Sequence, residues 1–134
     1  MLKLIEPVIE FSNNVLHKSL VSVCIQTYNH NKFIANCIES ILTQETDFHY
    51  EIIIGEDNST DGTREICQEY AEKYPDKIRL LLHSRKNLIE ILSKPTGRFN
   101  MLYNISQSRG KYIALCEGDD YWTDPYKLQK QVDL

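Results

Sequence analysis

Residues 50–62, with the sequence YEIIIGEDNSTDG, join an apolar run directly to a polar loop. An uninterrupted run of isoleucines is typical of a strand that is buried on both faces, as in a parallel sheet. The loop that follows is rich in Asn, Ser, Thr, Asp and Gly, which favour turns and helix starts. Residues 63–74 then carry Ile66, Tyr70 and Tyr74 at four-residue intervals, with a proline just beyond them. This spacing predicts a helix, so the stretch as a whole predicts a strand–loop–helix unit.

The same unit recurs on both sides of this stretch. Apolar, β-branched runs predict three further strands, at residues 20–27, 78–83 and 111–117. Helices are predicted at residues 32–42 and 99–108, and a last one from Asp124-Pro125, where an N-cap residue precedes a proline. Residues 84–96 receive no assignment.

Strands that alternate with helices predict an α/β fold, with a mostly parallel sheet and helices on both faces. We expect one domain over residues 20–134, preceded by an amino-terminal extension of residues 1–19. Because the chain ends inside a newly begun helix, we expect this domain to be incomplete at its carboxyl end. An incomplete sheet edge also predicts self-association into a homo-oligomer.

Charge and cysteine content narrow the class of protein. The formal net charge is -4, and no basic stretch is dense enough to follow a nucleic-acid backbone, so we expect no nucleic-acid partner. None of the four cysteines lies in a pair with metal-ligand spacing, and we expect all four to be reduced core residues. The sequence lacks a signal peptide and an apolar run that could span a bilayer. We therefore expect a cytoplasmic protein, and attachment to the inner face of the membrane through another part of the protein stays open.

Three predicted strands end in polar segments, at residues 26–29 (QTYN), 56–62 (EDNSTDG) and 117–120 (EGDD). In an open α/β sheet, ligands bind beyond the carboxyl ends of the strands. If the first strand lies between the second and the fourth, all three segments meet at one edge of the sheet. We expect the functional site at that edge.

Asp119 and Asp120 are candidate metal ligands. Adjacent carboxylates repel each other, and Mg²⁺ or Mn²⁺, which prefer oxygen ligands, would remove that repulsion while binding a diphosphate. The alternative is that both are ordinary loop residues, because Asp is common in turns. Glu117 is as well explained by a structural role as by metal binding.

Asp57, Gln26 and Tyr28 are candidate nucleotide-binding residues. The Asp57 carboxylate, at a strand tip, can accept hydrogen bonds from a base edge or a ribose hydroxyl. Gln26 can bond a base and Tyr28 can stack on one, although an isolated tyrosine here is more typical of the core rim.

The histidines and two further basic residues are explained by ordinary surface or capping roles. The four histidines form no metal or catalytic pattern, and we expect them at the surface or in caps: His17, His30, His49 and His83. Lys94 and Arg98 flank a turn and could reach a diphosphate, but we interpret both first as exposed surface charges.

The three polar segments, with the strands before them, resemble the family 2 glycosyltransferases, which have the GT-A fold. The resemblance rests on VSVCIQTYNHNKFIANCIESILTQ, EIIIGEDNSTDGT and GKYIALCEGDDYWTDPYKLQKQV in this order, and covers residues 20–134. It implies central strands in the order 3-2-1-4 and a nucleotide-sugar donor, typically a UDP-sugar. It also implies an unknown glycan or lipid-linked acceptor, and a role in cell-wall or polysaccharide biosynthesis.

The resemblance further implies roles for single residues. Asp57 matches the aspartate that bonds the base, and Gln26 and Tyr28 match positions beside base and ribose. Asp119 and Asp120 match the DXD element, in which the first acid approaches the ribose and the second the metal, Mn²⁺ or Mg²⁺.

Two positions depart from the family pattern. Met101-Leu102 stand where many relatives carry an Arg-Asn pair, which makes Arg98 a candidate substitute. No residue matches the general base of inverting transfer, which the resemblance places beyond residue 134. We therefore expect this chain to bind donor without transferring sugar.

Two other classes of protein share part of this pattern. A nucleotidyltransferase also combines a nucleotide, a metal and an α/β sheet, but it usually has a basic, glycine-rich loop where this chain has TYNHNKF. A receiver domain pairs acids at strand ends, but after the first strand, where Asn29 and His30 stand.

Overall fold

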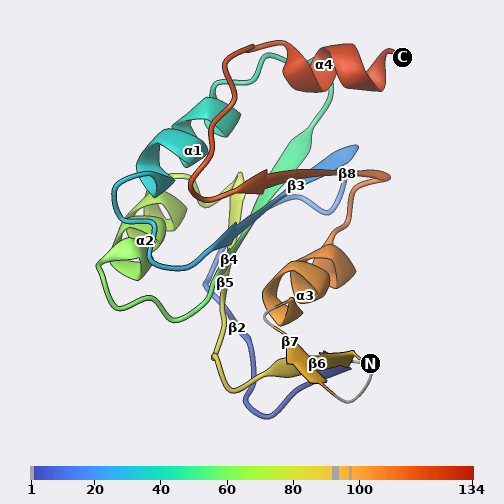
Figure 1. Cartoon of the computed structure of the whole chain (residues 1–134). Coiled ribbons are helices and arrows are strands. Elements are labelled where there is room, and N and C mark those ends of the chain that lie inside the picture. The colour runs from blue at the N-terminus through green and yellow to red at the C-terminus, as the bar shows by residue number, and fades with distance from the viewer. Residues whose placement is uncertain (1, 92–93, 97) are drawn as a thin grey trace.

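A computed structural model describes residues 2–91, 94–96 and 98–134. Its main body is a five-stranded sheet in the order β2-β5-β4-β3-β8 (Figure 1). The strands of this sheet are β2 (Ile9–Glu10), β3 (Val21–Thr27), β4 (Tyr50–Glu56), β5 (Ile78–Leu82) and β8 (Tyr112–Glu117). Strands β5, β4, β3 and β8 run parallel, and β2 pairs antiparallel with β5. The predicted α/β class and the predicted order 3-2-1-4 of the central strands are both confirmed.

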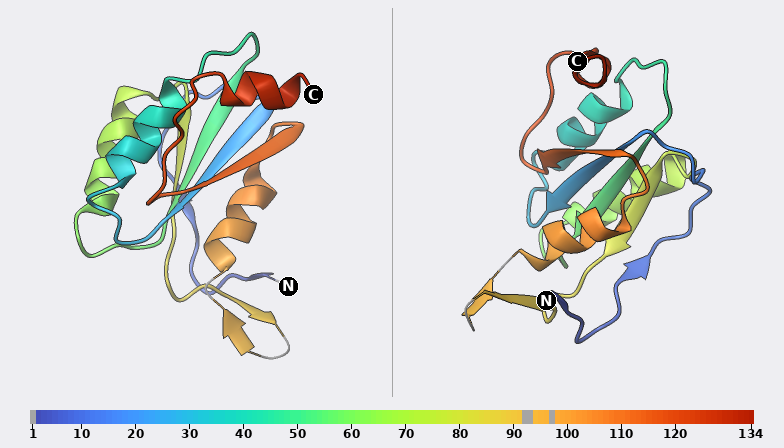
Figure 2. Two further views of the ribbon diagram at one scale, coloured as in Figure 1. Left: turned by 45° about the horizontal axis from the view of Figure 1, so that its top comes forward. Right: turned by 90° about the vertical axis from the view of Figure 1, so that its right-hand side faces the viewer.

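Helices cover both faces of the sheet. They are α1 (Ile34–Leu42), α2 (Thr63–Lys73), α3 (Phe99–Gln107) and α4 (Lys127–Val132). Helices α1 and α2 lie on one face and α3 on the other (Figure 2). Alternate residues of the central strands therefore enter different cores: Ile25 packs with the α1 and α2 side, whereas Cys24 packs with Ile53 on the α3 side. This alternation also decides which strand-end side chains face α3.

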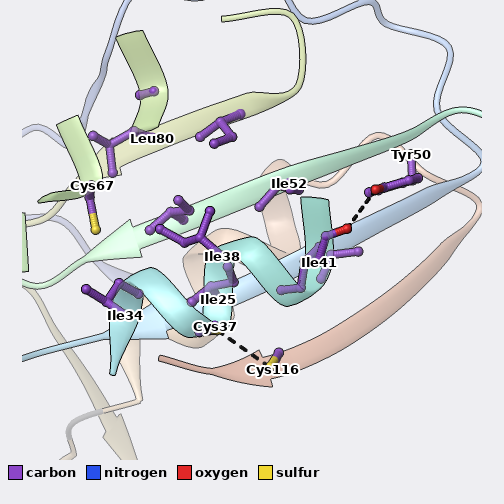
Figure 3. Packing of buried hydrophobic residues seen from close by; sticks show 14 of the residues in the cluster. Ile25, Ile34, Cys37, Ile38, Ile41, Tyr50, Ile52, Cys67, Leu80 and Cys116 are labelled. Atoms are coloured by element: carbon purple, nitrogen blue, oxygen red, sulfur yellow. Dashed lines mark hydrogen bonds between the residues drawn. The ribbon is translucent and has the colours of Figure 1, made fainter. Parts of the chain in front are cut away.

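The main core is built from isoleucines and small side chains packed between the sheet and α1 (Figure 3). Ile34, Ile38 and Ile41 of α1 are fully buried, as expected for a helix with one apolar stripe. All four cysteines are buried and free, which confirms the expectation of reduced core residues. Two of them, Cys37 and Cys116, join α1 to β8, with their sulfur atoms 3.7 Å apart.

The last helix begins later than the sequence indicates. Asp124 was expected to cap a helix that starts at Pro125, but α4 starts at Lys127 and its N-cap, Tyr126, makes no side-chain hydrogen bond. The Asp124 carboxylate instead accepts a hydrogen bond from the Tyr126 amide at 2.9 Å. Asp124-Pro125 therefore forms a turn before the helix, because a short acidic side chain can bond the backbone two residues on.

Residues 84–96, which received no assignment, contain two strands, β6 (Leu88–Ile91) and β7 (Lys94–Thr96). They pair antiparallel with each other, and β6 pairs with β1 (Leu2–Lys3). The amino-terminal residues thus contribute β1 to this small sheet and β2 to the main one.

His83 corrects one expectation from the sequence. It was expected at the surface or in a cap, but it is buried beside α3, where its Nε2 lies 3.0 Å from Asn104 Oδ1. Burial lowers the pKa of this imidazole, which favours its neutral form.

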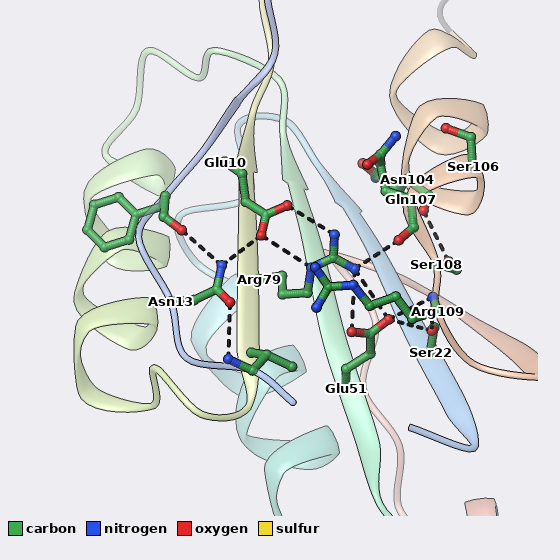
Figure 4. A network of polar contacts seen from close by, with 12 residues as sticks. Glu10, Asn13, Ser22, Glu51, Arg79, Asn104, Ser106, Gln107, Ser108 and Arg109 are labelled. Atoms are coloured by element: carbon green, nitrogen blue, oxygen red, sulfur yellow. Dashed lines mark hydrogen bonds and ion pairs between the residues drawn. The ribbon is translucent and has the colours of Figure 1, made fainter. Parts of the chain in front are cut away.

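A buried polar network lies at the amino ends of the central strands, away from the predicted site (Figure 4). Arg79 of β5 donates to the carboxylates of Glu51 and Glu10 and to the carbonyl oxygen of Gln107. Glu51 also accepts from the Ser22 hydroxyl at 2.7 Å. This network ties β2, β3, β4, β5 and the end of α3 together.

β8 forms one edge of the main sheet, and Tyr112, Ile113 and Leu115 on it are exposed. Self-association through this edge stays a prediction. Within the described residues, no helix has both the length and the apolar character needed to cross a bilayer.

Candidate functional site

Two loops at the carboxyl edge of the sheet are fastened to each other. The loop after β3 and the loop after β4 exchange hydrogen bonds, from the Asn29 amide to Ser59 Oγ and from the Thr60 amide to Asn29 Oδ1, both 2.9 Å long. Asn29 and Asn58 have positive φ, 52° and 59°, a conformation that Asn tolerates better than most residues. The two loops are therefore joined into a single rim rather than standing as two independent turns.

Glu56 stabilises the loop after β4 through its buried side chain. Its side chain is fully buried, pairs with Arg64 of α2, and accepts hydrogen bonds from the amides of Asn58 and Ser59. Because side chains alternate along a strand, Asp57 points to the opposite face, the α3 side. Glu56 is thus a structural acid and Asp57 is the one presented to a ligand.

A cleft of about 480 Å³ opens at this rim, between the strand ends and the start of α3. Most of its lining residues have polar or charged side chains: Gln26, Thr27, Tyr28, His30, Asp57, Arg85, Arg98, Asn100, Met101 and Glu117. Three predicted site residues, Gln26, Tyr28 and Asp57, are brought together here. Asp119 and Asp120 are not in the lining and lie beyond Glu117, on the segment that leaves β8.

Asp57, Arg85 and Tyr28 form one connected unit in the cleft wall. Arg85 Nη1 lies 2.9 Å from Asp57 Oδ2, and the Arg85 guanidinium carbon stands 3.8 Å from the centre of the Tyr28 ring. Burial raises the pKa of the Asp57 carboxyl, and the positive charge of Arg85 opposes that shift. The guanidinium covers one face of Tyr28, so a base could stack only on the other face or on Arg85 itself.

The side-chain amide of Gln26 is a buried polar group in the cleft that lacks hydrogen-bond partners among the described residues. Its side chain is 8% exposed, and within the described structure neither its Oε1 nor its Nε2 has a hydrogen-bond partner. A buried amide without partners costs about 1–3 kcal/mol. In native proteins such groups are satisfied by protein, water or ligand, so Gln26 is suited to bind a molecule that enters the cleft.

The ends of β3 and β8 approach closely beside the cleft. A Cβ added to Gly118 would lie 2.5 Å from Thr27 Oγ1 and 2.7 Å from His30 Nδ1, so the segment needs glycine there. His30 bridges the two strand ends, with Nδ1 3.0 Å from Thr27 Oγ1 and Nε2 3.9 Å from Asp119 Oδ2. His30, expected at the surface or in a cap, is therefore part of the cleft wall.

The carboxylates after β8 form an accessible acidic group. Asp119 is 56% exposed, and Asp120 Oδ1 accepts from the Tyr121 amide at 2.8 Å. The pKa of Glu117 is raised by burial and by the negative charge of Asp119. Acids that repel one another in this way favour a cation between them.

The oxygen ligands after β8 suit a cation that takes its remaining ligands from water and from a bound substrate. Among the described residues, no group of three or more His, Cys, Asp and Glu side chains forms a ready metal cage. Mg²⁺ keeps several waters and is usually held by one or two carboxylates plus substrate phosphates. Asp119 and Asp120 fit that mode of binding.

Sequence reasoning missed Arg85 and underrated Arg98. Arg98 was interpreted as a surface charge, but it lines the cleft. The side chain of Lys94, the other cation considered at that turn, lies outside the described part of the structure. Arg85 follows the end of β5, so the rule that strand ends converge could have found it.

Comparison with known proteins shows which family this chain resembles. The model of the family described as Glycosyl transferase family 2 matches residues 22–134. The chain is 41% identical over 114 residues to an uncharacterized protein of Mycobacterium tuberculosis, covering 85% of this chain and 30% of that protein. It is 36% identical over 117 residues to a Bacillus subtilis protein named as a teichuronic acid biosynthesis glycosyltransferase, TuaG, covering 87% of this chain and 42% of that one. The chain thus spans less than half the length of these curated relatives.

Solved structures agree with this placement. The structure of Staphylococcus aureus TarS in complex with UDP matches with a TM-score of 0.63 and 25% identity, over 84% of this chain and 31% of that one. A mannosyltransferase from Pyrobaculum calidifontis, solved with GDP-Man and Mn²⁺, shares the fold with a TM-score of 0.66 at 21% identity, over 96% of this chain and 35% of that one. Because the family model covers most of the chain and the two curated relatives above are more than 30% identical to it, this chain belongs to glycosyl transferase family 2.

Proposed function

We propose that this chain forms the donor-binding part of a glycosyltransferase that transfers a sugar from a UDP-sugar to an acceptor hydroxyl, with Mg²⁺ or Mn²⁺. The observation that carries the proposal is the cleft at the carboxyl edge of the sheet, where Gln26, Asp57 and Arg85 converge from three strand ends. Family membership favours this reaction over nucleotidyl transfer and over a receiver-like regulatory role.

The cleft residues divide into two groups by their chemistry. Asp57, Gln26 and Tyr28 supply an acceptor, an unpartnered amide and an aromatic ring, which together suit a base and ribose. Arg98 is the cation at the start of α3, and guanidinium groups suit phosphate oxygens. The acids after β8 would face the diphosphate through a cation.

Asp120, with Asp119, would hold the divalent cation. When bound, such a cation supplies Lewis-acid stabilisation of the nucleoside diphosphate as it leaves. The chain's own residues orient the donor, and His30 holds the rim of β3 against the segment that carries Asp119.

Sugar transfer itself is proposed for the whole protein, because this chain spans only 30% to 42% of the two curated relatives described above. We propose an inverting reaction, in which a carboxylate takes the proton of the acceptor hydroxyl as its oxygen attacks the anomeric carbon. That base is proposed to lie beyond residue 134. A glycan or lipid-linked acceptor in cell-wall or polysaccharide biosynthesis is the class proposed, and the name of the B. subtilis relative supports it.

Calorimetric titration of the chain with UDP, in Mn²⁺ and again in EDTA, tests donor binding. We expect binding in Mn²⁺ that EDTA weakens at least about tenfold, and that Asp120→Ala weakens by a similar factor. Asp76→Ala is the matched control, because Asp76 is exposed in the turn before β5, at the other end of the sheet. Binding that ignores both EDTA and Asp120→Ala would remove the metal from the proposal, and no binding of UDP would refute it.

A further inference from the structure

One buried side chain fastens the amino-terminal segment to the turn after β5. Asn87 is 4% exposed. Its Oδ1 accepts hydrogen bonds from the Ile5 and Glu6 amides, at 2.6 and 2.8 Å, and its Nδ2 donates to the Glu6 carbonyl oxygen at 2.8 Å. Both ends of the Asn87 amide therefore bind the same short piece of backbone.

The amino-terminal segment is also held before and after this contact. Before it, β1 pairs antiparallel with β6, and after it, Val8 packs in the core on the α3 side and β2 pairs with β5. Figure 1 shows the segment passing from the small sheet to the side of β5. We call residues 2–10 the amino-terminal strap. Lys86 Nζ also pairs with Glu6 Oε1 at 2.9 Å, but both side chains are exposed, so this ion pair restrains the strap little.

Arg85 lies on the same turn as Asn87. The Asn87 backbone amide closes this turn by donating to the Ser84 carbonyl oxygen at 3.1 Å. On one side of the turn, the Arg85 guanidinium pairs with Asp57 at 2.9 Å and lies 3.8 Å from the centre of the Tyr28 ring. On the other side, Asn87 binds the strap. The turn is thus held between the cleft and the strap.

The two sides of the turn restrain it unequally. The Arg85 side chain is half exposed, and an exposed ion pair restrains a long side chain only weakly. Asn87 is buried and bonds backbone to backbone through its short side chain. The backbone from which Arg85 reaches the cleft is therefore set mainly by the strap.

We propose that Asn87 is a positioning residue of the donor site, which holds the turn after β5 against the amino-terminal strap so that Arg85 stands in the cleft wall. The inference rests on the proposed function, because it concerns how tightly the cleft binds donor. The strap lies outside residues 22–134, which the family model matches. It is therefore a support for the cleft that this model does not include.

The proposal requires coupling in both directions. A chain whose turn is released binds donor only through the fraction of molecules that keep Arg85 in place, so its apparent affinity falls by that fraction. Because coupling between two sites is reciprocal, bound donor must stabilise the contact between strap and Asn87 by the same factor. A contact that only stabilised the fold would leave the affinity of the folded chain unchanged.

A double-mutant cycle tests whether Asn87 acts through Arg85. Wild type, Asn87→Ala, Arg85→Ala and the double variant are each titrated with UDP in Mn²⁺ by calorimetry. We expect Asn87→Ala to weaken UDP about three- to tenfold, the range of a few net hydrogen bonds, and Arg85→Ala to weaken it at least as much. The double variant should bind no more weakly than Arg85→Ala alone, because displacing the turn has no effect once the side chain that it positions is gone.

Asn13→Ala is the matched control. The Asn13 side chain also makes hydrogen bonds in the amino-terminal region, to Glu10, Phe11 and Val15. These partners lie within three residues of it in the sequence, so the substitution removes an equivalent amide without releasing the turn after β5. UDP affinity should be unchanged. Urea unfolding verifies that each variant is folded under the conditions of the titration.

Hydrogen exchange gives a second readout that needs no substitution of Asn87. The Ile5 and Glu6 amides both donate to Asn87 Oδ1, so their exchange reports release of the strap. In the wild-type chain, saturating UDP should slow both amides by about the factor by which Asn87→Ala weakens UDP, roughly three- to tenfold. In Arg85→Ala, UDP should leave their exchange unchanged.

Each other outcome overturns a defined claim. If the effects of Asn87→Ala and Arg85→Ala multiply in the double variant, Asn87 acts independently of Arg85, and the inference fails while the proposed function stands. It fails likewise if either single substitution leaves UDP affinity unchanged, or if UDP does not slow exchange at Ile5 and Glu6. If the wild-type chain binds no UDP, the proposed function falls and the inference with it.

Discussion

Replacing Arg79 by methionine should destabilise the chain strongly without touching the cleft. Arg79 is 2% exposed and Glu51 is fully buried. The guanidinium reaches both carboxylate oxygens of Glu51 at 3.4 Å and Glu10 Oε1 at 3.0 Å. Without it, the Glu51 side chain keeps, among the described residues, only the Ser22 hydroxyl and the Arg109 amide as partners. Breaking a buried pair by removing one partner costs about 3–5 kcal/mol, because an uncompensated charge stays in the core.

A second substitution separates the charge from the packing. Glu51→Gln added to Arg79→Met removes the stranded charge and keeps the shape, so the double variant should recover about 2 kcal/mol of the loss. Lys130→Met is the control for an exposed pair: Lys130 Nζ lies 2.7 Å from Asp124 Oδ2, yet both side chains are exposed. Its effect should stay under about 1 kcal/mol.

Urea unfolding followed by tryptophan fluorescence measures all three variants. The chain has a single tryptophan, Trp122, which packs against the main core and so reports its loss. A domain of this size is usually stable by about 5–15 kcal/mol, so a loss of 3–5 kcal/mol moves the midpoint well beyond error. The reasoning is refuted if Arg79→Met costs less than about 1 kcal/mol, or if the double variant is no more stable than the single one.

Three further predictions concern the cleft. Gly118→Ala should cost about 1–3 kcal/mol of stability and weaken UDP binding, because the added Cβ would press on Thr27 Oγ1 and His30 Nδ1. Unchanged unfolding and unchanged UDP binding would contradict the close approach of β3 and β8. UDP affinity should fall on acidification at a higher pH than an ordinary aspartate requires, because burial raises the pKa of Asp57 and a protonated carboxyl cannot accept the base N–H. Calorimetry from about pH 4 to pH 7 measures that midpoint, and Arg85→Ala should move it upward. Removing the metal with EDTA should weaken UDP far more than uridine, since the cation is expected to act through the diphosphate, and equal weakening of both would contradict that role.

The fold followed from the sequence because its pattern is local. The runs at residues 20–27 and 50–55 are long and apolar enough to require burial on both faces, and the polar segments after them mark where each strand ends. Since parallel strands end at one edge, Gln26, Tyr28 and Asp57 were expected together, and the cleft brings them together. Which ligand they bind stays a prediction.

The features that were missed depend on contacts between distant residues. Arg85 stands in a turn where an exposed cation is the ordinary expectation, and only its place beside Tyr28 and Asp57 distinguishes it. Glu51 and Arg79 each put a charge into a buried strand, which was a visible signal, but their pairing depends on the adjacency of β4 and β5. The start of α4 was misplaced because the sequence alone does not distinguish a helix cap from a turn.

A crystal structure of the chain grown with UDP and Mn²⁺, with the manganese located by its anomalous signal, tests the central claim most directly. The account predicts the uracil edge within hydrogen-bonding distance of Asp57 and Arg85, the Gln26 amide bonded to the nucleotide, and manganese between the diphosphate and Asp119 or Asp120. A nucleotide ordered outside the cleft, or manganese remote from both carboxylates, would contradict the account.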